Sequence, residues 1–372
     1  MTVCAYKLRT SRPTRKYTTY ITSALFAHLV RLKADPFFFL SCQGELRSQR
    51  VLFFGAGQAN CGAANLLVLG QYFPFTTFRL PDCPYETDTF FFIVSAMMDS
   101  EPELTMQEAR ARIWLVDSKG LVYQNRPEDK LKGLSSDKAP FAVDLGTLGG
   151  SQSFDKNDLA QIVKASRCTV LVGAAAIPKA FTKSVITQMA SQNKNPVIFA
   201  LSNPTSKAEC TAFEAYEWSG GRAIFASGTK FDDLTVKGVG LRAPGFANNA
   251  FIFPGIALGS LAVGATKVTD KMFLAAAVTL AALVTEEQLQ KGAVYPPTST
   301  IKESAVFVGA GVAAAAVDEG VAREGVCGSG FISSTGAKVP SLDGGGADDT
   351  CTNWEACVRD FAKTCLCRCD DS

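Results

Sequence analysis

The strongest chemical signal in the sequence is a glycine turn. Four apolar residues, 51–54, run directly into Gly55, Ala56, Gly57, Gln58 and Ala59. Glycines after a parallel strand permit a tight turn and a close approach of the backbone, and the N–H groups that begin the next helix can bind a pyrophosphate. The strict fingerprint has a third glycine where Asn60 stands. The stretch favours a dinucleotide turn, with an ordinary strand–helix connection as the alternative.

An acidic residue about 20 positions after such a turn usually binds the adenine ribose. Here Asp117 follows the apolar stretch 113–116, which is much farther along the chain. We interpret residues 70–98, which are aromatic and rich in turn residues, as an insertion that explains this distance. Ser118 and Lys119 stand where the 2′-phosphate of NADP would bind. The sequence therefore predicts a nucleotide site for NAD or NADP, with a turn cap as the alternative role of Asp117.

Three further apolar stretches, 169–173, 196–201 and 223–228, read as buried parallel strands. In open α/β sheets ligands bind beyond the carboxyl ends of the strands. We therefore expect five strand ends to converge on one crevice: Gly55, Asp117, Gly173, Asn203 and Ser227. The predicted fold class is α/β, a Rossmann-like, doubly wound and mostly parallel sheet with helices on both faces.

Residues 243–260 read as a turn followed by a helix of small residues, and two consecutive amides, Asn248 and Asn249, precede that helix. They could orient a carboxylate or merely satisfy a turn. Helical patterning is expected in the segments 61–69, 104–112, 158–164, 181–192, 272–284 and 300–317. Residues 306–314 superficially repeat the glycine turn, but they lie within the last of these patterns. We therefore predict a packing helix there and no second nucleotide turn.

Composition limits the class of protein. The 372 residues are 47% hydrophobic and 19% charged, which is typical of a folded globular protein, and the net charge of +2 gives no reason to expect nucleic acid or an acidic membrane surface as a partner. No uncharged apolar run reaches the roughly 18 residues of a membrane-spanning helix. The single histidine, His28, argues against a serine-hydrolase triad and against histidine-rich metal sites.

The two ends of the chain differ from the middle. Residues 1–34 are basic and contain no acid, as in a mitochondrial or plastid transit peptide; an extension without an address is the alternative. Twelve cysteines without a paired framework indicate reduced thiols in an intracellular compartment, either the mitochondrion or the cytoplasm. We expect an extension at 1–43, a nucleotide-binding domain at 44–325 and a Gly/Cys-rich tail at 326–372. The tail favours free thiols over a metal site, because it has no standard cysteine pair.

Several stretches, in their order and spacing, resemble the NAD(P)-binding part of malic enzymes: 113–121, 199–210, 222–228, 248–255 and 295–297. The resemblance implies oxidation of L-malate with NAD or NADP, decarboxylation to pyruvate with Mg²⁺ or Mn²⁺, and a homo-oligomer. It also implies that residues 55–59 form the pyrophosphate turn and that Asp117 binds the ribose. Asn203 and Asn249 would be the two amides that bind malate.

The departures from the family concern catalysis. Its tyrosine acid, lysine base, malate-binding arginine and acidic metal ligands lie upstream of the glycine turn, and residues 1–43 contain no matching stretch. Without the metal the decarboxylated carbanion has no sink, and without the lysine nothing takes the hydroxyl proton. The catalytic residues are therefore unassigned and no metal ligand is predicted. We expect little or no malate oxidation by this chain alone; a non-catalytic NAD(P)-binding module or a regulatory fragment is the alternative. Smaller departures are Phe246-Ala247, where the family usually has Gln-Gly, and Lys230, where it has proline.

Overall fold

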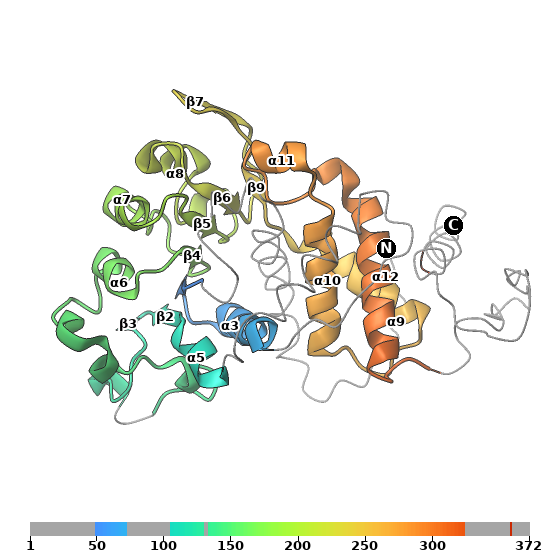
Figure 1. The fold of residues 1–372 in the computed structure, drawn as a ribbon, viewed down its shortest axis with the longest axis horizontal. Coiled ribbons are helices and arrows are strands. Elements are labelled where there is room, and N and C mark those ends of the chain that lie inside the picture. Colours follow the sequence, from blue (N-terminus) through green and yellow to red (C-terminus); the bar gives the residue numbers. More distant parts are fainter. Residues whose placement is uncertain (1–48, 73–104, 130–132, 324–357, 359–372) are drawn as a thin grey trace, which may run out of the picture.

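The structure of the protein is a computed structural model, which describes residues 49–72, 105–129, 133–323 and the single residue Val358 (Figure 1). The predicted extension at 1–43, most of the insertion at 70–98 and almost all of the Gly/Cys-rich tail lie outside these residues. The described part contains the whole predicted nucleotide turn and every predicted strand end.

A seven-stranded sheet forms the centre of the fold, in the order β3-β2-β1-β4-β5-β6-β9. The strands are β1 (Val51–Phe54), β2 (Ile113–Asp117), β3 (Gly120–Leu121), β4 (Val170–Gly173), β5 (Val197–Ala200), β6 (Ile224–Ser227) and β9 (Gly245–Phe246). Every pairing is parallel except that of β2 with β3. Strand β1 lies between β2 and β4, with Val51 opposite Ile113 on one side and Val170 on the other. The predicted mostly parallel sheet is confirmed.

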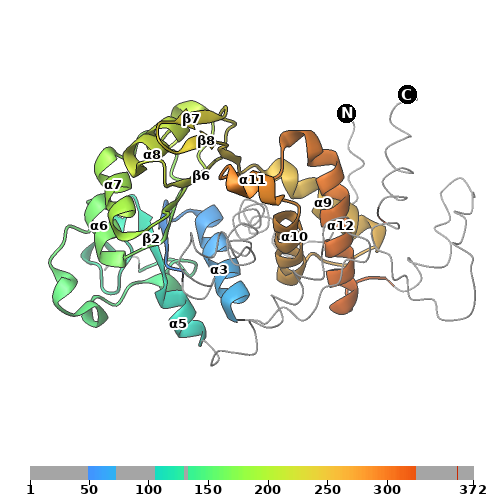
Figure 2. The same cartoon turned by 45° about the horizontal axis from the view of Figure 1, so that its top comes forward.

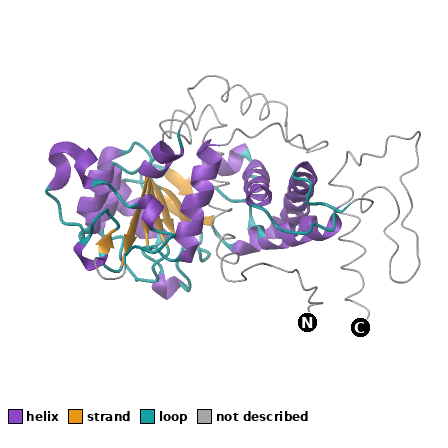
Figure 3. Cartoon of the chain, turned by 90° about the horizontal axis from the view of Figure 1, so that it is seen from below, coloured by secondary structure: helices purple, strands orange, loops and turns teal. Residues whose placement is uncertain are grey.

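Helices cover both faces of the sheet (Figure 3). They are α3 (Gln58–Tyr72) and α5 (Met106–Ala111) on one face, and α6 (Leu159–Ser166), α7 (Lys183–Gln192) and α8 (Ala212–Ser219) on the other. Alternate residues of β1 enter separate cores, because side chains point to opposite faces of a strand: Phe53 packs with α3 and Leu52 with α6 and α7. The doubly wound, Rossmann-like arrangement is therefore confirmed.

A group of helices lies beside the sheet (Figures 1 and 2). It consists of α9 (Phe253–Ala262), α10 (Asp270–Ala282), α11 (Glu286–Gln290) and α12 (Ile301–Asp318). Helices α9 and α12 touch through glycines: a Cβ on Gly259 would lie 2.2 Å from the carbonyl oxygen of Gly309. Residues 306–314, the second glycine pattern, lie inside α12 as predicted.

Two further observations concern α12. Val358 is fully buried, and its Cγ1 would lie 2.9 Å from a Cβ on Gly309, so this residue of the predicted tail belongs to the main core. Within the described residues, one helix, Thr298–Asp318, is long and apolar enough to span a membrane, but 67% of its 18-residue apolar window is buried inside the protein. That burial is the pattern of a core helix.

The remaining elements were not predicted. The segment 120–157 contains the 3₁₀ helices η2 (Pro127–Asp129), η3 (Ala139–Phe141) and η4 (Leu145–Gln152). Others are η5 (Thr205–Lys207), η6 (Asn249–Phe251) and η7 (Thr298–Thr300), and a hairpin of β7 (Leu234–Val236) and β8 (Gly240–Arg242) projects from the top of Figure 1. Helix α8 was also missed; it begins with a capping box formed by Thr211 and Glu214.

Candidate functional site

The carboxyl ends of β1, β2, β4, β5 and β6 are aligned at one edge of the sheet. Phe54 pairs with both Val116 and Gly173, and Ala200 pairs with both Gly173 and Ser227. The ladder continues one bond beyond the strands, because Ala174 N–H donates to Phe54 O at 3.0 Å, Leu201 N–H to Gly173 O at 2.8 Å and Gly228 N–H to Ala200 O at 3.1 Å. The predicted strands therefore end together, while the crevice and the ligand roles of its residues stay predictions.

The glycine turn between β1 and α3 has the geometry that its sequence predicts. Gly55 has a φ of +105°, and a Cβ there would lie 2.9 Å from the carbonyl oxygen of Ala174, so only glycine fits. Gly57 is exposed, with nothing within 4 Å of the position of its missing Cβ. The backbone that leads into Gln58 and Ala59, the first residues of α3, is thus open to a ligand.

Asn60 explains the missing third glycine of the fingerprint. Its side chain is 3% exposed, and its amide donates to the carbonyl oxygen of Gly55 at 2.6 Å and to that of Phe54 at 3.4 Å. These bonds close the turn from the inside. Helix α3 has no acidic residue in its first turn, so its N-terminal N–H groups keep their partial positive charge.

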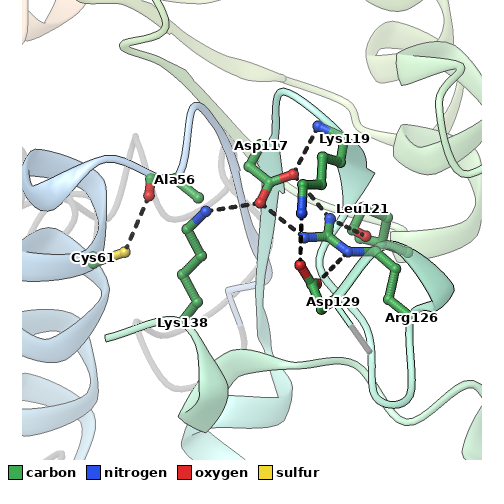
Figure 4. A network of polar contacts seen from close by, with 8 residues as sticks. All are labelled: Ala56, Cys61, Asp117, Lys119, Leu121, Arg126, Asp129 and Lys138. Carbon is green, nitrogen blue, oxygen red and sulfur yellow. Dashed lines mark hydrogen bonds and ion pairs between the residues drawn. The ribbon is translucent and has the colours of Figure 1, made fainter. Parts of the chain in front are cut away.

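The Asp117 carboxylate at the end of β2 is held by three neighbours (Figure 4). Arg126 Nη1 donates to Oδ1 at 2.8 Å and Nη2 to Oδ2 at 3.0 Å. Lys138 Nζ donates to Oδ2 at 2.7 Å, and the Lys119 N–H donates to Oδ1 at 2.9 Å. Asp117 therefore has partners on both oxygens, a feature that the predicted role in ribose binding did not include.

These contacts set the protonation of the cluster. Burial alone would raise the pKa of Asp117, but the hydrogen bonds from Arg126, Lys138 and the Lys119 N–H outweigh it and hold the pKa well below the ordinary 3.8. The same Asp117 hydrogen bond raises the pKa of Arg126. Arg126 also donates through Nε to Asp129 at 2.6 Å, and Lys119 pairs with Asp129 at 2.9 Å. Asp117, Asp129 and Arg126 are therefore ionised at neutral pH.

Sequence reasoning missed Arg126 and Lys138. Both belong to the 3₁₀ and turn segments that follow β3, where no helical or strand period marks them. Arg126 is 3% exposed, and its Nη1 also donates to the carbonyl oxygen of Leu121 at 3.2 Å. A buried arginine on a loop is a signal only after the fold is known, because burial is what makes it unusual.

The predicted malate amides lie at the ends of β5 and β9. Asn203 and Asn249 are both exposed, and a cis peptide bond joins Asn203 to Pro204. Gly228 connects the two segments: a Cβ there would lie 2.9 Å from Asn203 Nδ2, and its carbonyl oxygen accepts from Asn248 Nδ2 at 3.3 Å. Asn248 also caps η6, since its Oδ1 accepts from the Ala250 N–H at 3.0 Å. Of the consecutive amides Asn248 and Asn249, the side chain of Asn248 therefore forms hydrogen bonds within the turn, and Asn249 remains exposed.

Gly173 is required by a buried acid. A Cβ on Gly173 would lie 2.6 Å from the Cγ and Cδ of Glu209 and 2.8 Å from the ring of Phe181. Glu209 is completely buried, and burial raises its pKa although hydrogen bonds, chiefly from Ser202, partly offset this. Neither Ser202 nor Glu209 was among the predicted site residues.

The described residues include no group of three or more His, Cys, Asp or Glu side chains that could hold a metal ion. They therefore do not form the Mg²⁺ or Mn²⁺ site that the resemblance implies. The cysteines described there, Cys61, Cys168 and Cys210, are buried free thiols whose pKa burial raises.

Known proteins of similar sequence agree with this fold. Residues 92–317 match the family model described as the malic enzyme NAD-binding domain. The NADP-dependent malic enzyme of Phaseolus vulgaris is 42% identical over 279 residues, which are 75% of this chain and 41% of that protein. The NADP-dependent malic enzyme of Vitis vinifera is 41% identical over the same length, 40% of that protein. The chain thus spans about two fifths of the length of these relatives.

Solved structures agree in fold. The malic enzymes of Entamoeba histolytica and Pyrococcus horikoshii each superpose with a TM-score of 0.57 over 95% of this chain, at 19% and 17% identity, covering 55% and 61% of those chains. The family-model match begins at residue 92, after β1 and the glycine turn, but the structure places that strand in the middle of the sheet. Because the family model matches more than half of its length, the chain belongs to the malic enzyme family.

Proposed function

We propose that this chain binds NADP at the glycine turn and at the end of β2, as the nucleotide-binding part of an enzyme that oxidises and decarboxylates L-malate. The observation that carries the proposal is the open backbone at Gly57 beside the uncompensated N-terminus of α3. A pyrophosphate fits there, because the N–H groups and the helix dipole both favour an anion. Membership of the malic enzyme family supports the same ligand.

NADP is favoured over NAD by the charges around Asp117. Both oxygens of that carboxylate already accept hydrogen bonds from cationic side chains or a backbone N–H. The five charged groups of the cluster are Asp117, Asp129, Lys119, Arg126 and Lys138, which carry one net positive charge. The 2′-phosphate of NADP is an anion, so the cations of this cluster would attract it. It would lie next to Ser118. The two relatives described above are both NADP-dependent.

The substrate contacts that we assign to this chain are Asn203 and Asn249. Both amides are exposed at the strand-end edge, and Gly228 joins their segments. A neutral amide can donate to a malate carboxylate without cancelling the positive charge of the oxidised nicotinamide, which favours hydride transfer from malate. When bound, NADP supplies the acceptor for the hydride of malate. The residues that we assign in this chain bind and orient the nucleotide and the substrate. No proton-transfer or metal step is assigned to them.

Fluorescence titration of the purified chain with NADPH and NADH tests the proposal. NADPH should bind at least about tenfold more tightly, the effect of one charge-assisted contact. Lys138→Gln should reduce the preference, because it removes a cation of the Asp117 cluster. Lys271→Gln removes an exposed lysine of α10 and serves as the control. Failure of both nucleotides to bind would disprove the proposed site, and equal affinity would disprove the choice of NADP.

A further inference from the structure

The loops after β4 and β5 are joined by a buried hydrogen-bond network that contains none of the residues assigned to ligands above. The Ser202 hydroxyl donates to Oε1 of Glu209 and accepts from the Ala176 N–H at 2.8 Å. Oε1 of Glu209 also accepts from the Ala175 N–H at 3.2 Å, and its Oε2 from the Ser202 N–H at 3.4 Å. Ser202 is 6% exposed and Glu209 is fully buried.

On one side the network holds the loop after β4. Ala176 has a φ of +55°, a left-handed conformation that is unfavourable for alanine, and its N–H is bound by Ser202. The same loop touches the nucleotide turn, since the carbonyl oxygen of Ala174 would lie 2.9 Å from a Cβ on Gly55. A shift of this loop would therefore shift the wall of the glycine turn.

On the other side the network holds the loop after β5. Ser202 immediately precedes Asn203, and Asn203 lies against Gly228. The Ser202 side chain and backbone N–H are both bound to Glu209, so the acid fixes the residue before the exposed amide from two directions. The position of Asn203 depends on these bonds.

The network is unusual as a mere packing device. A buried carboxylate costs free energy unless it is fully paired, and the ion pairs of the described residues do not include Glu209. Lys179, in the loop after β4, pairs with Glu214 instead, with its Nζ 2.7 Å from Oε1 of Glu214. Because Gly173 has no side chain, Glu209 fits against the end of β4. Glu209 thus lies where the end of β4, the loop after β4 and the loop after β5 meet.

We propose that Ser202 and Glu209 are positioning residues that hold the loops after β4 and β5 together and so shape the nucleotide site and present Asn203. The proposal rests on the proposed binding of NADP at this edge. It assigns no contact with a ligand to either residue.

Two matched serine variants test the proposal. Ser202→Ala removes the link between the loops. Ser219→Ala is the control, since Ser219 is 2% exposed, donates to Tyr216 O at 3.2 Å and accepts from the Ala223 N–H at 3.0 Å, just before the opposite end of β6. Each loses a buried hydroxyl with comparable partners. NADPH should bind about tenfold more weakly to Ser202→Ala but within about twofold of wild type to Ser219→Ala.

Hydrogen exchange supplies a readout that needs no nucleotide. The amides of Ala175 and Ala176 should exchange about tenfold faster in Ser202→Ala than in wild type and unchanged in Ser219→Ala. Glu209→Gln retains one acceptor oxygen and should give a smaller effect in both assays, which covers the case in which Ser202→Ala does not fold.

The outcomes separate the two claims. Wild-type protein that does not bind NADPH would overturn the proposed function and this inference with it. NADPH binding to wild type, with the same affinity and the same exchange in Ser202→Ala and Ser219→Ala, would overturn the positioning role alone. Weaker binding with faster exchange at Ala175 and Ala176 only in Ser202→Ala and Glu209→Gln would support it.

Discussion

Arg126 and Asp117 form a bidentate pair, with two parallel N–O contacts of 2.8 and 3.0 Å between the guanidinium and the carboxylate. Both side chains are buried, 2% and 9% exposed. Such pairs are strongly oriented, because the planar fork matches both oxygens. The pair fixes the end of β2, and the neighbouring Ser118 and Lys119, before any nucleotide arrives.

Removing the arginine should destabilise the fold. Arg126→Met leaves the buried Asp117 without its bidentate partner, so we expect the free energy of unfolding to fall by about 3 kcal/mol. Lys119→Gln, which breaks the pair with Asp129 from a lysine that is 47% exposed, should cost less than about 1 kcal/mol. Urea denaturation measures both. Equal losses in the two variants would contradict the importance of burial here.

The pKa of Asp117 predicts a dependence on acid. The folded pKa lies below the ordinary 3.8, so the unfolded chain binds the proton more readily. The stability that Asp117 contributes is fully present above its ordinary pKa and is lost as the pH falls from about 5 toward the folded pKa. Asp117→Asn should reduce the slope of unfolding free energy against pH in this window. Glu287→Gln removes an exposed carboxylate whose pKa is lowered by Lys291, so it should reduce the slope much less; identical slopes for wild type and Asp117→Asn would refute the prediction.

The close contact of α9 with α12 predicts that even an alanine side chain at Gly259 lowers the stability of the fold. Gly259→Ala gains up to about 1 kcal/mol of helix propensity, but its Cβ would lie 2.2 Å from the Gly309 carbonyl oxygen. Overpacking should win, with a net loss of about 2 kcal/mol in thermal or chemical denaturation. Gly57→Ala meets no atom and should leave stability within about 0.5 kcal/mol while weakening NADPH binding. A Gly259→Ala protein as stable as wild type would show that the helices can separate freely.

The adjacent amides should respond in opposite ways. Asn248→Ala removes the cap of η6 and the bond to Gly228, so stability should fall by about 1 kcal/mol. Asn249→Ala alters an exposed side chain and should leave stability nearly unchanged. In the presence of NADPH, only Asn249→Ala should weaken binding of L-malate without loss of stability, as measured by calorimetry. A loss of stability in Asn249→Ala equal to that in Asn248→Ala would contradict the division of roles.

The strands were predictable from sequence because the sheet is covered on both faces. Four-residue apolar runs such as Val51–Phe54 and Val170–Gly173 have no charge to place in either core. Helix ends were less predictable: α3 begins at Gln58, three residues before the expected start. Short elements such as β9 and the β7–β8 hairpin were missed, since two or three residues carry no period.

The candidate site was predictable only at its strand ends. Asp117 and Asn203 follow recognisable strands, so the parallel arrangement places them. Arg126 and Glu209 reach the site from loops, and their contacts depend on burial and on the path of the folded chain, which a pattern does not contain. Asn60 shows the same limit. It stands where the fingerprint has glycine, and its side chain forms a hydrogen bond within the turn, which the pattern does not indicate.

The central place of β1 has a consequence for synthesis of the chain. This apolar strand is made before both of its neighbours, and the second of them, at Val170, follows roughly 120 residues after Val51. At translation rates of about 5–20 residues per second, β1 waits on the order of 6 to 24 s for its second partner. During that time an unpaired apolar strand edge is exposed to other nascent chains. Ribosome-bound intermediates ending before β4 should accordingly depend on chaperones, and release of β1 from them should coincide with the emergence of Gly173.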